Sequence, residues 1–199
     1  MKNKQPERIA IFGGAFDPPT FGHLSIANYL IQRMGFDEVW LMPAYRHTFP
    51  KNMTEFQHRF NMCKLLVNDE RIKVSDYQYI HDLDSSTLNL FIVLRKEFRK
   101  KKEFFMVIGS DNANVIHKWI NYEQLLEKVP FIVFERKGQE LKEDTIWCLF
   151  EPHIFVKHLK QEKEFSSTIV REAIKKEEPI KKYVPENIIK YIKKNKLYV

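Results

Sequence analysis

The sequence predicts an α/β protein with a doubly wound, mostly parallel sheet and helices on both faces. Short apolar segments rich in β-branched and aromatic residues alternate with segments whose apolar residues recur at helical spacing. Successive strand candidates lie far enough apart for a helix in each connection, which favours parallel neighbours. The end of the chain holds two further helical segments, which predicts a small helical C-terminal part over about 165–199.

Each expected element follows from a local pattern. Strands are expected at 8–12, 38–44, 71–77, 103–111, 130–136, 145–150 and 153–159. Helices are expected at 24–34, 54–69, from about 85 to 98, and at 121–129, 166–178 and 185–197. Gly35 is expected to end the first helix, Thr54 to cap the second, and Pro185 to lie near the first turn of the last. The charged stretch 136–144 is expected to be an exposed loop.

Composition limits the class of protein. The 199 residues, 44% hydrophobic and 30% charged, suit one soluble domain spanning 1–199. No apolar run approaches the ~18–20 residues of a membrane span, and the first residues lack the apolar core of a signal peptide. Cys63 and Cys148 lie far apart in apolar surroundings, as free thiols of a reducing compartment do. A cytoplasmic protein without a membrane partner is therefore expected.

The net charge of +7 is the second compositional feature. Much of the basic excess lies in 95–103 and in the last twenty or so residues, where Lys alternates with apolar residues. Such an excess can attract nucleic acid, anionic lipid or small polyphosphates. Because the sequence has no aromatic and basic interleaving of the RRM type, we interpret these segments as solvated helix faces and expect no nucleic-acid partner.

The turn after the first strand, GGAFDPPTFGH at 13–23, has an unusual composition. Gly13 and Gly14 can take positive φ and let a ligand approach the backbone closely. Thr20 is a candidate cap for a helix whose N-terminus offers free N–H groups and partial positive charge to a phosphate. His23, in the first turn of that helix, can donate to the same anion. The sequence contains neither a P-loop nor a dinucleotide fingerprint.

A second candidate phosphate site is EFSSTIVREAI at 164–174. It opens a helix with Ser166, Ser167 and Thr168 and places Arg171 one turn later, so hydroxyls, free N–H groups and a guanidinium meet at one helix end. Taken alone, each motif also fits a bland structural role, as a tight turn or an ordinary serine cap. Together, two helix N-termini can hold the two ends of a polyphosphate.

These segments resemble the signature motifs of the nucleotidyltransferase superfamily with a Rossmann-like fold, G-x-F-D-P-x-[HT]-x-G-H and I-S-S-T-x-x-R. Within it the chain is most similar to bacterial nicotinate-nucleotide adenylyltransferases, over nearly its whole length. GSDNANVIHKWINYEQLL at 109–126 resembles the G-x-D…K-W segment of that family, which shapes the nucleotide and pyridine sites. DSSTLN at 84–89 and YRHTFPK at 45–51 resemble two of its substrate loops.

The resemblance implies adenylyl transfer from ATP to nicotinate mononucleotide, giving deamido-NAD and pyrophosphate in NAD biosynthesis. Mg²⁺ would accompany ATP, and no protein-bound metal is expected. The implied catalytic residues are His23, Thr20 and Arg171. The implied ATP and phosphate ligands are Gly13, Gly14, Ala15, Phe16, Gly22, Ser166, Ser167, Thr168, Gly109 and Asp111. The implied pyridine-nucleotide ligands are Thr87, Trp119, Lys118 and Lys51.

Four positions depart from the family pattern. Thr20 stands where nicotinate-specific members usually have His, and threonine there is common in phosphopantetheine adenylyltransferases. Ser86, Leu88 and Asn89 replace the usual Tyr, Tyr and Asp. The alternatives are therefore a phosphopantetheine adenylyltransferase of coenzyme A biosynthesis, an enzyme preferring nicotinamide mononucleotide, or a nucleotide-sensing or RNA-binding protein on the same fold. The longer chain and its Lys-Trp pair at 118–119 speak against phosphopantetheine, and the oligomeric state stays open.

Overall fold

The computed structural model describes residues 5–45, 53–84, 86–157 and 165–199. Its centre is a six-stranded sheet in the order β3-β2-β1-β4-β5-β6, in which all five neighbouring pairs run parallel. The strands are β1 (Glu7–Gly14), β2 (Glu38–Pro43), β3 (Ile72–Val74), β4 (Lys102–Gly109), β5 (Phe131–Phe134) and β6 (Ile154–Val156). The order proceeds outward from β1 in one direction and from β4 in the other, which confirms the doubly wound, Rossmann-like fold.

The helices follow the expected alternation with the strands. They are α1 (Phe21–Gln32), α2 (Phe56–Leu66), α3 (Tyr77–Ile80), α4 (Thr87–Phe98), α5 (Ser110–Ala113), α6 (Tyr122–Lys128), α7 (Ser167–Lys175) and α8 (Glu186–Lys194), with 3₁₀ turns η1 (Arg99–Lys101), η2 (Ile116–Lys118) and η3 (Glu143–Leu149). Gly35, with φ at +67°, follows the end of α1 as expected. Thr54 does not cap α2: the N-cap is Glu55, and the Thr54 N–H donates to Asp17 instead.

Alternate residues of the central strands face two separate cores. In β1, Ala10 and Phe12 belong to one core, whereas Ile9 and Ile11 belong to the other. Helices α1, α2, α7 and α8 contribute to the first core, and α3, α4, α5 and α6 contribute to the second. This period-2 division gives the sheet helices on both faces, as the sequence predicts.

The predicted strand at 145–150 is wrong, because this segment lies mostly within the 3₁₀ turn η3. Its buried residues, Thr145 and Cys148, are three apart, which is the repeat of a 3₁₀ helix. The Thr145 hydroxyl donates to Oδ1 of Asn114 at 2.9 Å, a contact from a distant segment. Ile146 and Leu149, between and after the buried pair, are exposed.

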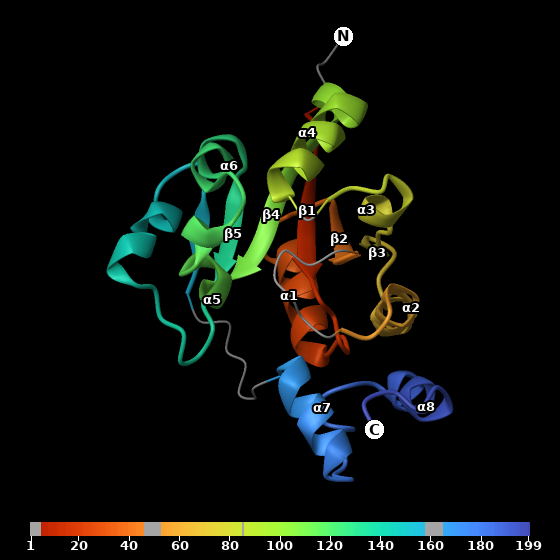
Figure 1. Cartoon of the computed structure of the whole chain (residues 1–199). Helices are drawn as coiled ribbons and strands as arrows, with labels where there is room; N and C mark the ends of the chain where they lie inside the picture. The colour runs from red at the N-terminus through yellow and green to blue at the C-terminus, as the bar shows by residue number, and fades with distance from the viewer. Residues whose placement is uncertain (1–4, 46–52, 85, 158–164) are drawn as a thin grey trace.

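The carboxyl ends of the strands point to the end of the molecule where α7 and α8 lie (Figure 1).

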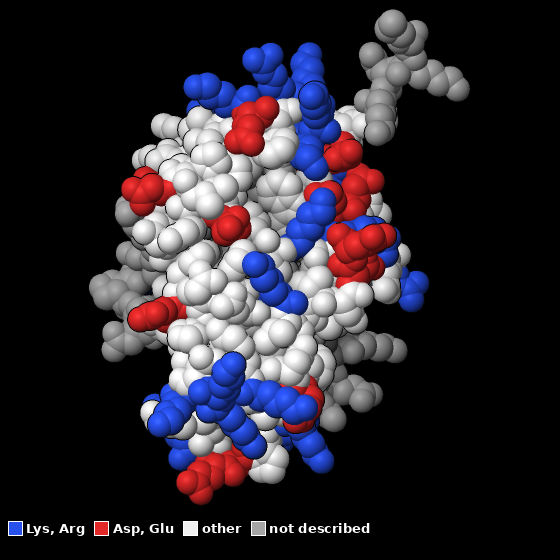
Figure 2. Space-filling model, turned by 90° about the vertical axis from the view of Figure 1, so that its right-hand side faces the viewer, with Lys and Arg blue, Asp and Glu red and all other residues white. Residues whose placement is uncertain are grey.

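Lys and Arg side chains gather at two opposite ends of the molecule (Figure 2). One group covers α4 and η1, and the other covers the C-terminal helices. The exposed residues are Arg95, Lys96, Arg99, Lys100 and Lys101 in the first group, and Lys175, Lys176, Lys181, Lys182, Lys190, Lys193, Lys194 and Lys196 in the second. No helix in the described ranges is long and apolar enough to cross a membrane. The domain extent 1–199 stays a prediction.

Candidate active site

The turn from β1 to α1 reverses at Phe16 rather than at its glycines. Phe16 has φ at +50°, whereas neither Gly13 nor Gly14 has positive φ, which corrects the expectation for these two residues. Space is what the glycines provide: a Cβ at Gly13 would lie 2.7 Å from Cε of Met106, and one at Gly14 would lie 3.3 Å from the Phe16 ring. The backbone of this turn is therefore closely packed against buried side chains.

His23 lies in the first turn of α1, against the rings of Phe12 and Phe16, at centroid distances of 5.8 and 4.9 Å. Its Nδ1 accepts a hydrogen bond from the Thr20 backbone N–H at 3.0 Å. Burial, helped by the positive charge of Arg136, lowers the pKa of His23 to about 3. The ring is therefore neutral at pH 7 and carries its hydrogen on Nε2, so it can donate one hydrogen bond to an anion.

Thr20 is the N-cap of α1 and is fully buried. Its hydroxyl donates to the carbonyl oxygen of Phe165 at 3.0 Å and also lies 2.9 Å from Nδ1 of His23. Because a hydroxyl has one hydrogen, that hydrogen is committed to Phe165 in this structure. In this structure the Thr20 hydroxyl therefore joins α1 to the segment before α7, and its contact with a phosphate stays a prediction.

The start of α7 lies directly on this turn. The Ser166 hydroxyl caps α7 by accepting from the Ile169 N–H at 3.2 Å, so the helix begins at the serines as expected. The Ser167 hydroxyl donates to the carbonyl oxygen of Pro18 at 2.8 Å, and Nη1 of Arg171 donates to that of Asp17 at 2.7 Å. Two motifs about 150 residues apart in sequence are therefore in direct contact.

Gly22 allows this close approach. A Cβ built on Gly22 would lie 2.7 Å from Cβ of Phe165 and 3.3 Å from its carbonyl oxygen. Any larger residue would push the start of α1 away from the segment that leads into α7. The N-termini of both helices, which carry free N–H groups and partial positive charge, are held together by this contact.

A second cluster lies at the carboxyl end of β4. Nη1 of Arg136 contacts Oδ2 of Asp111 at 3.1 Å, and the Arg136 N–H donates to the Ser110 hydroxyl. Oδ1 of Asp111 is buried without a hydrogen-bond partner. Gly109 leaves the space that this pair occupies, because a Cβ there would collide with that oxygen and lie 2.6 Å from Nε of Arg136. An unsatisfied buried carboxylate oxygen is suited to accept a ligand hydroxyl.

Arg136 was missed by the sequence analysis, which placed it in an exposed loop. It follows β5, and its charge acts on His23. The rule that selects turns at the carboxyl ends of parallel strands also applies to this turn, so the position of Arg136 was a usable signal.

The predicted pyridine-nucleotide residues that the structure describes lie in or beside elements of the other face of the sheet. Thr87 is the first residue of α4, whose N-cap Ser86 accepts from the Asn89 N–H at 3.3 Å. Trp119 follows η2 and packs partly buried against the second core, beside the exposed Lys118. His23 and Arg171 come from helices of the first face. Lys51 lies outside the described residues.

The four departures from the family pattern have structural roles here. Besides Thr20 and the α4 cap Ser86, Leu88 is buried in the second core and Asn89 donates to Oδ2 of Asp84 at 2.9 Å. Among the described residues, no group of three or more His, Cys, Asp or Glu side chains could hold a metal ion.

A family model described as cytidylyltransferase-like matches residues 11–173, a span that holds both motifs. The chain therefore belongs to the cytidylyltransferase-like family, and it is a nucleotidyltransferase.

Two curated relatives and one solved structure are similar to this chain over nearly its whole length. A probable nicotinate-nucleotide adenylyltransferase of Clostridium tetani is 34% identical, over 96% of this chain and 99% of that protein. The nicotinate-nucleotide adenylyltransferase of Bacillus subtilis is 31% identical, over 96% and 98%. Among solved structures, the Plasmodium falciparum nicotinic acid mononucleotide adenylyltransferase complexed with NaAD superposes with a TM-score of 0.83 at 28% identity, over 96% and 97% of the two chains.

Proposed function

We propose that this protein transfers the adenylyl group of ATP to nicotinate mononucleotide, giving deamido-NAD and pyrophosphate. The observation that carries the proposal is the contact of two helix N-termini, one with His23 and one with Arg171, at a single turn. Such an end-to-end pair of positive helix ends fits a polyphosphate. The relatives and the structural neighbour named above support nicotinate mononucleotide as the acceptor.

The neutral His23 ring is the first donor we assign to the reaction. In the attack on the α-phosphorus, negative charge develops on the pyrophosphate leaving group, and the Nε2 hydrogen stabilises it. The side chain cannot act as a general base through Nδ1, because that nitrogen already accepts from Thr20. The reaction needs no general base, since the second pKa of the acceptor phosphate lies near ~6 and the attacking oxygen is already ionised at neutral pH.

The start of α7 supplies the remaining charge stabilisation. We assign the N–H groups near Ser167 and Thr168, and the remaining hydrogens of Arg171, to the β- and γ-phosphates. We assign Gly13, Gly14, Ala15, Phe16 and Gly22 to the backbone surface that the triphosphate approaches. Mg²⁺ enters as part of the MgATP substrate and neutralises phosphate charge. Catalysis then comes from alignment and electrostatic stabilisation.

We assign the binding of the nucleoside and pyridine groups of the two substrates to residues around β4. We assign the free oxygen of Asp111 to a nucleotide hydroxyl, with Gly109 providing the close approach. Trp119 stacks on the pyridine ring, with Lys118 beside it, and Thr87 at the start of α4 meets the nicotinate carboxylate. We assign Lys51 to a substrate phosphate.

A substrate panel tests the proposal. Purified protein is incubated with MgATP and, separately, nicotinate mononucleotide, nicotinamide mononucleotide or phosphopantetheine, and pyrophosphate release is measured. We expect the highest kcat/KM with nicotinate mononucleotide. A preference for either other acceptor would reassign the substrate, and no release with any acceptor would overturn the enzyme proposal. In that last case, salt-dependent RNA binding would favour the binding-protein alternative.

His23→Ala tests the catalytic assignment. Loss of a donor to the developing charge should lower kcat by about 100-fold or more. Ser25→Ala, on the exposed side of the same helix, is the matched control and should keep the wild-type kcat. Near-normal turnover by His23→Ala would remove His23 from the mechanism.

A further inference from the structure

Asp17 joins three distant segments in the turn between β1 and α1. It is 3% exposed. Its backbone carbonyl accepts from Nη1 of Arg171 at 2.7 Å, and its Oδ2 accepts from the Thr54 N–H at 3.1 Å. Its Oδ1 accepts from the hydroxyl of Tyr198 at 2.6 Å, one residue before the C-terminus. The turn, α7, the start of α2 and the end of the chain thus meet at one residue.

Arg59 is the counter-charge of this carboxylate. It is 1% exposed and donates to the carbonyl oxygens of Ala15, Ala44 and Thr54, at 2.8, 2.8 and 2.7 Å. Burial lowers the pKa of Arg59, and the charge of Asp17 opposes that decrease. Because a buried carboxylate oxygen without a donor is costly, the Tyr198 hydroxyl helps to keep Asp17 in one conformation.

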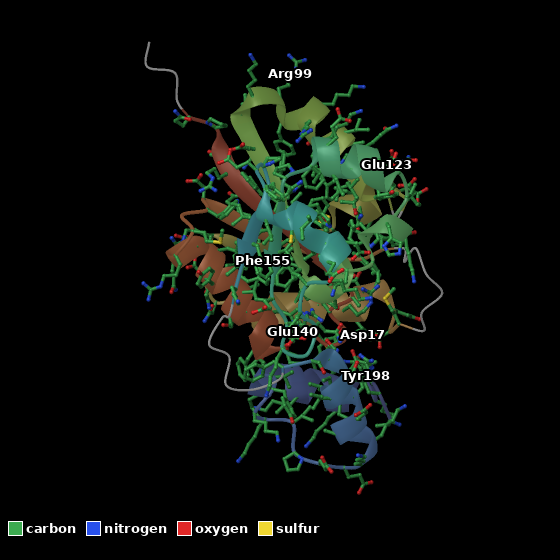
Figure 3. The ribbon with its side chains drawn as sticks, turned by 90° about the vertical axis from the view of Figure 1, so that its left-hand side faces the viewer. Asp17, Arg99, Glu123, Glu140, Phe155 and Tyr198 are labelled. Carbon is green, nitrogen blue, oxygen red and sulfur yellow. The ribbon has the colours of Figure 1, made fainter. Side chains whose placement is uncertain are left out.

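The end of the chain turns back toward Asp17 beyond α8. Lys196, with φ at +51°, closes α8, because its N–H donates to the Lys193 carbonyl and the Leu197 N–H donates to the Ile192 carbonyl. Tyr198 also has positive φ, at +68°. Leu197 and Tyr198 pack against the first core. Burial and the Asp17 hydrogen bond raise the pKa of Tyr198, so its phenol stays a donor at neutral pH. Figure 3 shows Tyr198 and Asp17 next to each other.

We propose that Tyr198 is a positioning residue for adenylyl transfer, acting through Asp17 on the turn that leads to His23 and receives Arg171. The inference rests on the proposed function. Arg171 docks on the Asp17 carbonyl, so a change in the conformation of Asp17 displaces the guanidinium. In the proposed mechanism Arg171 stabilises charge that develops on the leaving group, so its displacement weakens the transition state more than the bound ATP. The effect should therefore fall on kcat rather than on KM.

The matched pair Tyr198→Phe and Tyr191→Phe tests the proposal. The Tyr191 hydroxyl lies 3.0 Å from Nδ1 of His58 and accepts from Nδ2 of Asn61 at 3.2 Å, so it joins α8 to α2 away from the turn. Each variant loses one phenol hydroxyl from the C-terminal part. We expect Tyr198→Phe to lower kcat about 10-fold through a sub-ångström displacement, with KM for ATP changed less than about threefold. Tyr191→Phe should keep the wild-type kcat.

Thermal unfolding of both variants separates positioning from general destabilisation. Similar midpoints with unequal kcat support the proposal, and equal kcat values overturn it, as does a loss confined to KM. In an Arg171→Lys background the loss caused by Tyr198→Phe should shrink to less than about threefold, because the affected contact is already altered. An undiminished loss there would also overturn it. Inactive wild-type protein would overturn the proposed function, whereas active wild type with an unaffected Tyr198→Phe would overturn this inference alone.

Discussion

Gly22→Ala tests whether catalysis depends on the contact between the two helix starts. The added Cβ would lie 2.7 Å from Cβ of Phe165. Carbon atoms pack at about 3.5–4.0 Å, so the start of α1 and the segment before α7 must separate by about 1 Å. Overpacking costs about 1–3 kcal/mol, and replacing glycine by alanine in a helix returns about 1 kcal/mol, which leaves a net loss of about 0–2 kcal/mol.

The effect on activity should be much larger than the effect on stability. His23 is the next residue after the substitution, and Arg171 lies in the helix that Phe165 precedes. A displacement of about 1 Å at reacting groups can lower the rate about 100-fold. We therefore expect kcat to fall about 100-fold while the midpoint of thermal unfolding falls by no more than about 8 °C.

The assay is steady-state pyrophosphate release with the preferred acceptor, beside thermal unfolding of the same preparations. Ser25→Ala, on the exposed side of α1, is the control for the helix and should match wild type. In the Gly22→Ala background, Phe165→Gly removes the colliding Cβ and should restore part of kcat. Normal turnover by Gly22→Ala, despite a measurable loss of stability, would show that catalysis does not depend on close contact between the start of α1 and the segment before α7.

Two further predictions concern pH and substrate recognition. The pKa of His23 is about 3 in the folded chain, against an ordinary value of 6.5, so below pH 6.5 the unfolded state binds more protons than the folded state. The free energy of unfolding of the wild type should therefore fall by up to about 1.4 kcal/mol per pH unit below pH 6.5, and His23→Gln should remove this loss. Urea unfolding of both proteins at several pH values measures it, and parallel pH dependences would contradict the prediction. Trp119→Ala should raise KM for the pyridine substrate and leave KM for ATP unchanged in initial-rate measurements, and equal changes in both would contradict stacking on the pyridine ring.

Patterns of neighbouring residues sufficed for the sheet and for most helix boundaries. The apolar strand at 103–111 ends in a polar turn, and β4 ends at Gly109. Ser166 caps α7 through a hydrogen bond to a residue three positions along, so a local sequence pattern could predict it. The strand prediction for 145–150 failed because the conformation of this segment depends on Asn114, about 30 residues earlier. The side-chain oxygen of Asn114 accepts from the Thr145 hydroxyl. No local pattern contains that information.

The candidate site shows the same limit. Arg136 stands in a charged stretch typical of loops, and only the folded backbone shows that its guanidinium fills the space a Cβ at Gly109 would need. Tyr198 lies in a tail of alternating Lys and apolar residues that a solvated helix explains equally well. Its contact with Asp17 spans 181 positions. Tyr198 became visible only through a contact that the fold creates, whereas the place of Arg136 after a parallel strand was a signal that the sequence already held.

Thr20 bears on the choice between the two subfamilies. By resemblance to the family pattern, threonine at this position is common in phosphopantetheine adenylyltransferases, whereas nicotinate-specific members usually have histidine. In the structure the Thr20 hydroxyl is fully buried and donates to the Phe165 carbonyl. Packing between α1 and the approach to α7 therefore gives Thr20 a structural role that is the same for every acceptor. We predict that the choice of acceptor depends instead on the residues at the start of α4 and after η2, where Thr87 and Trp119 lie.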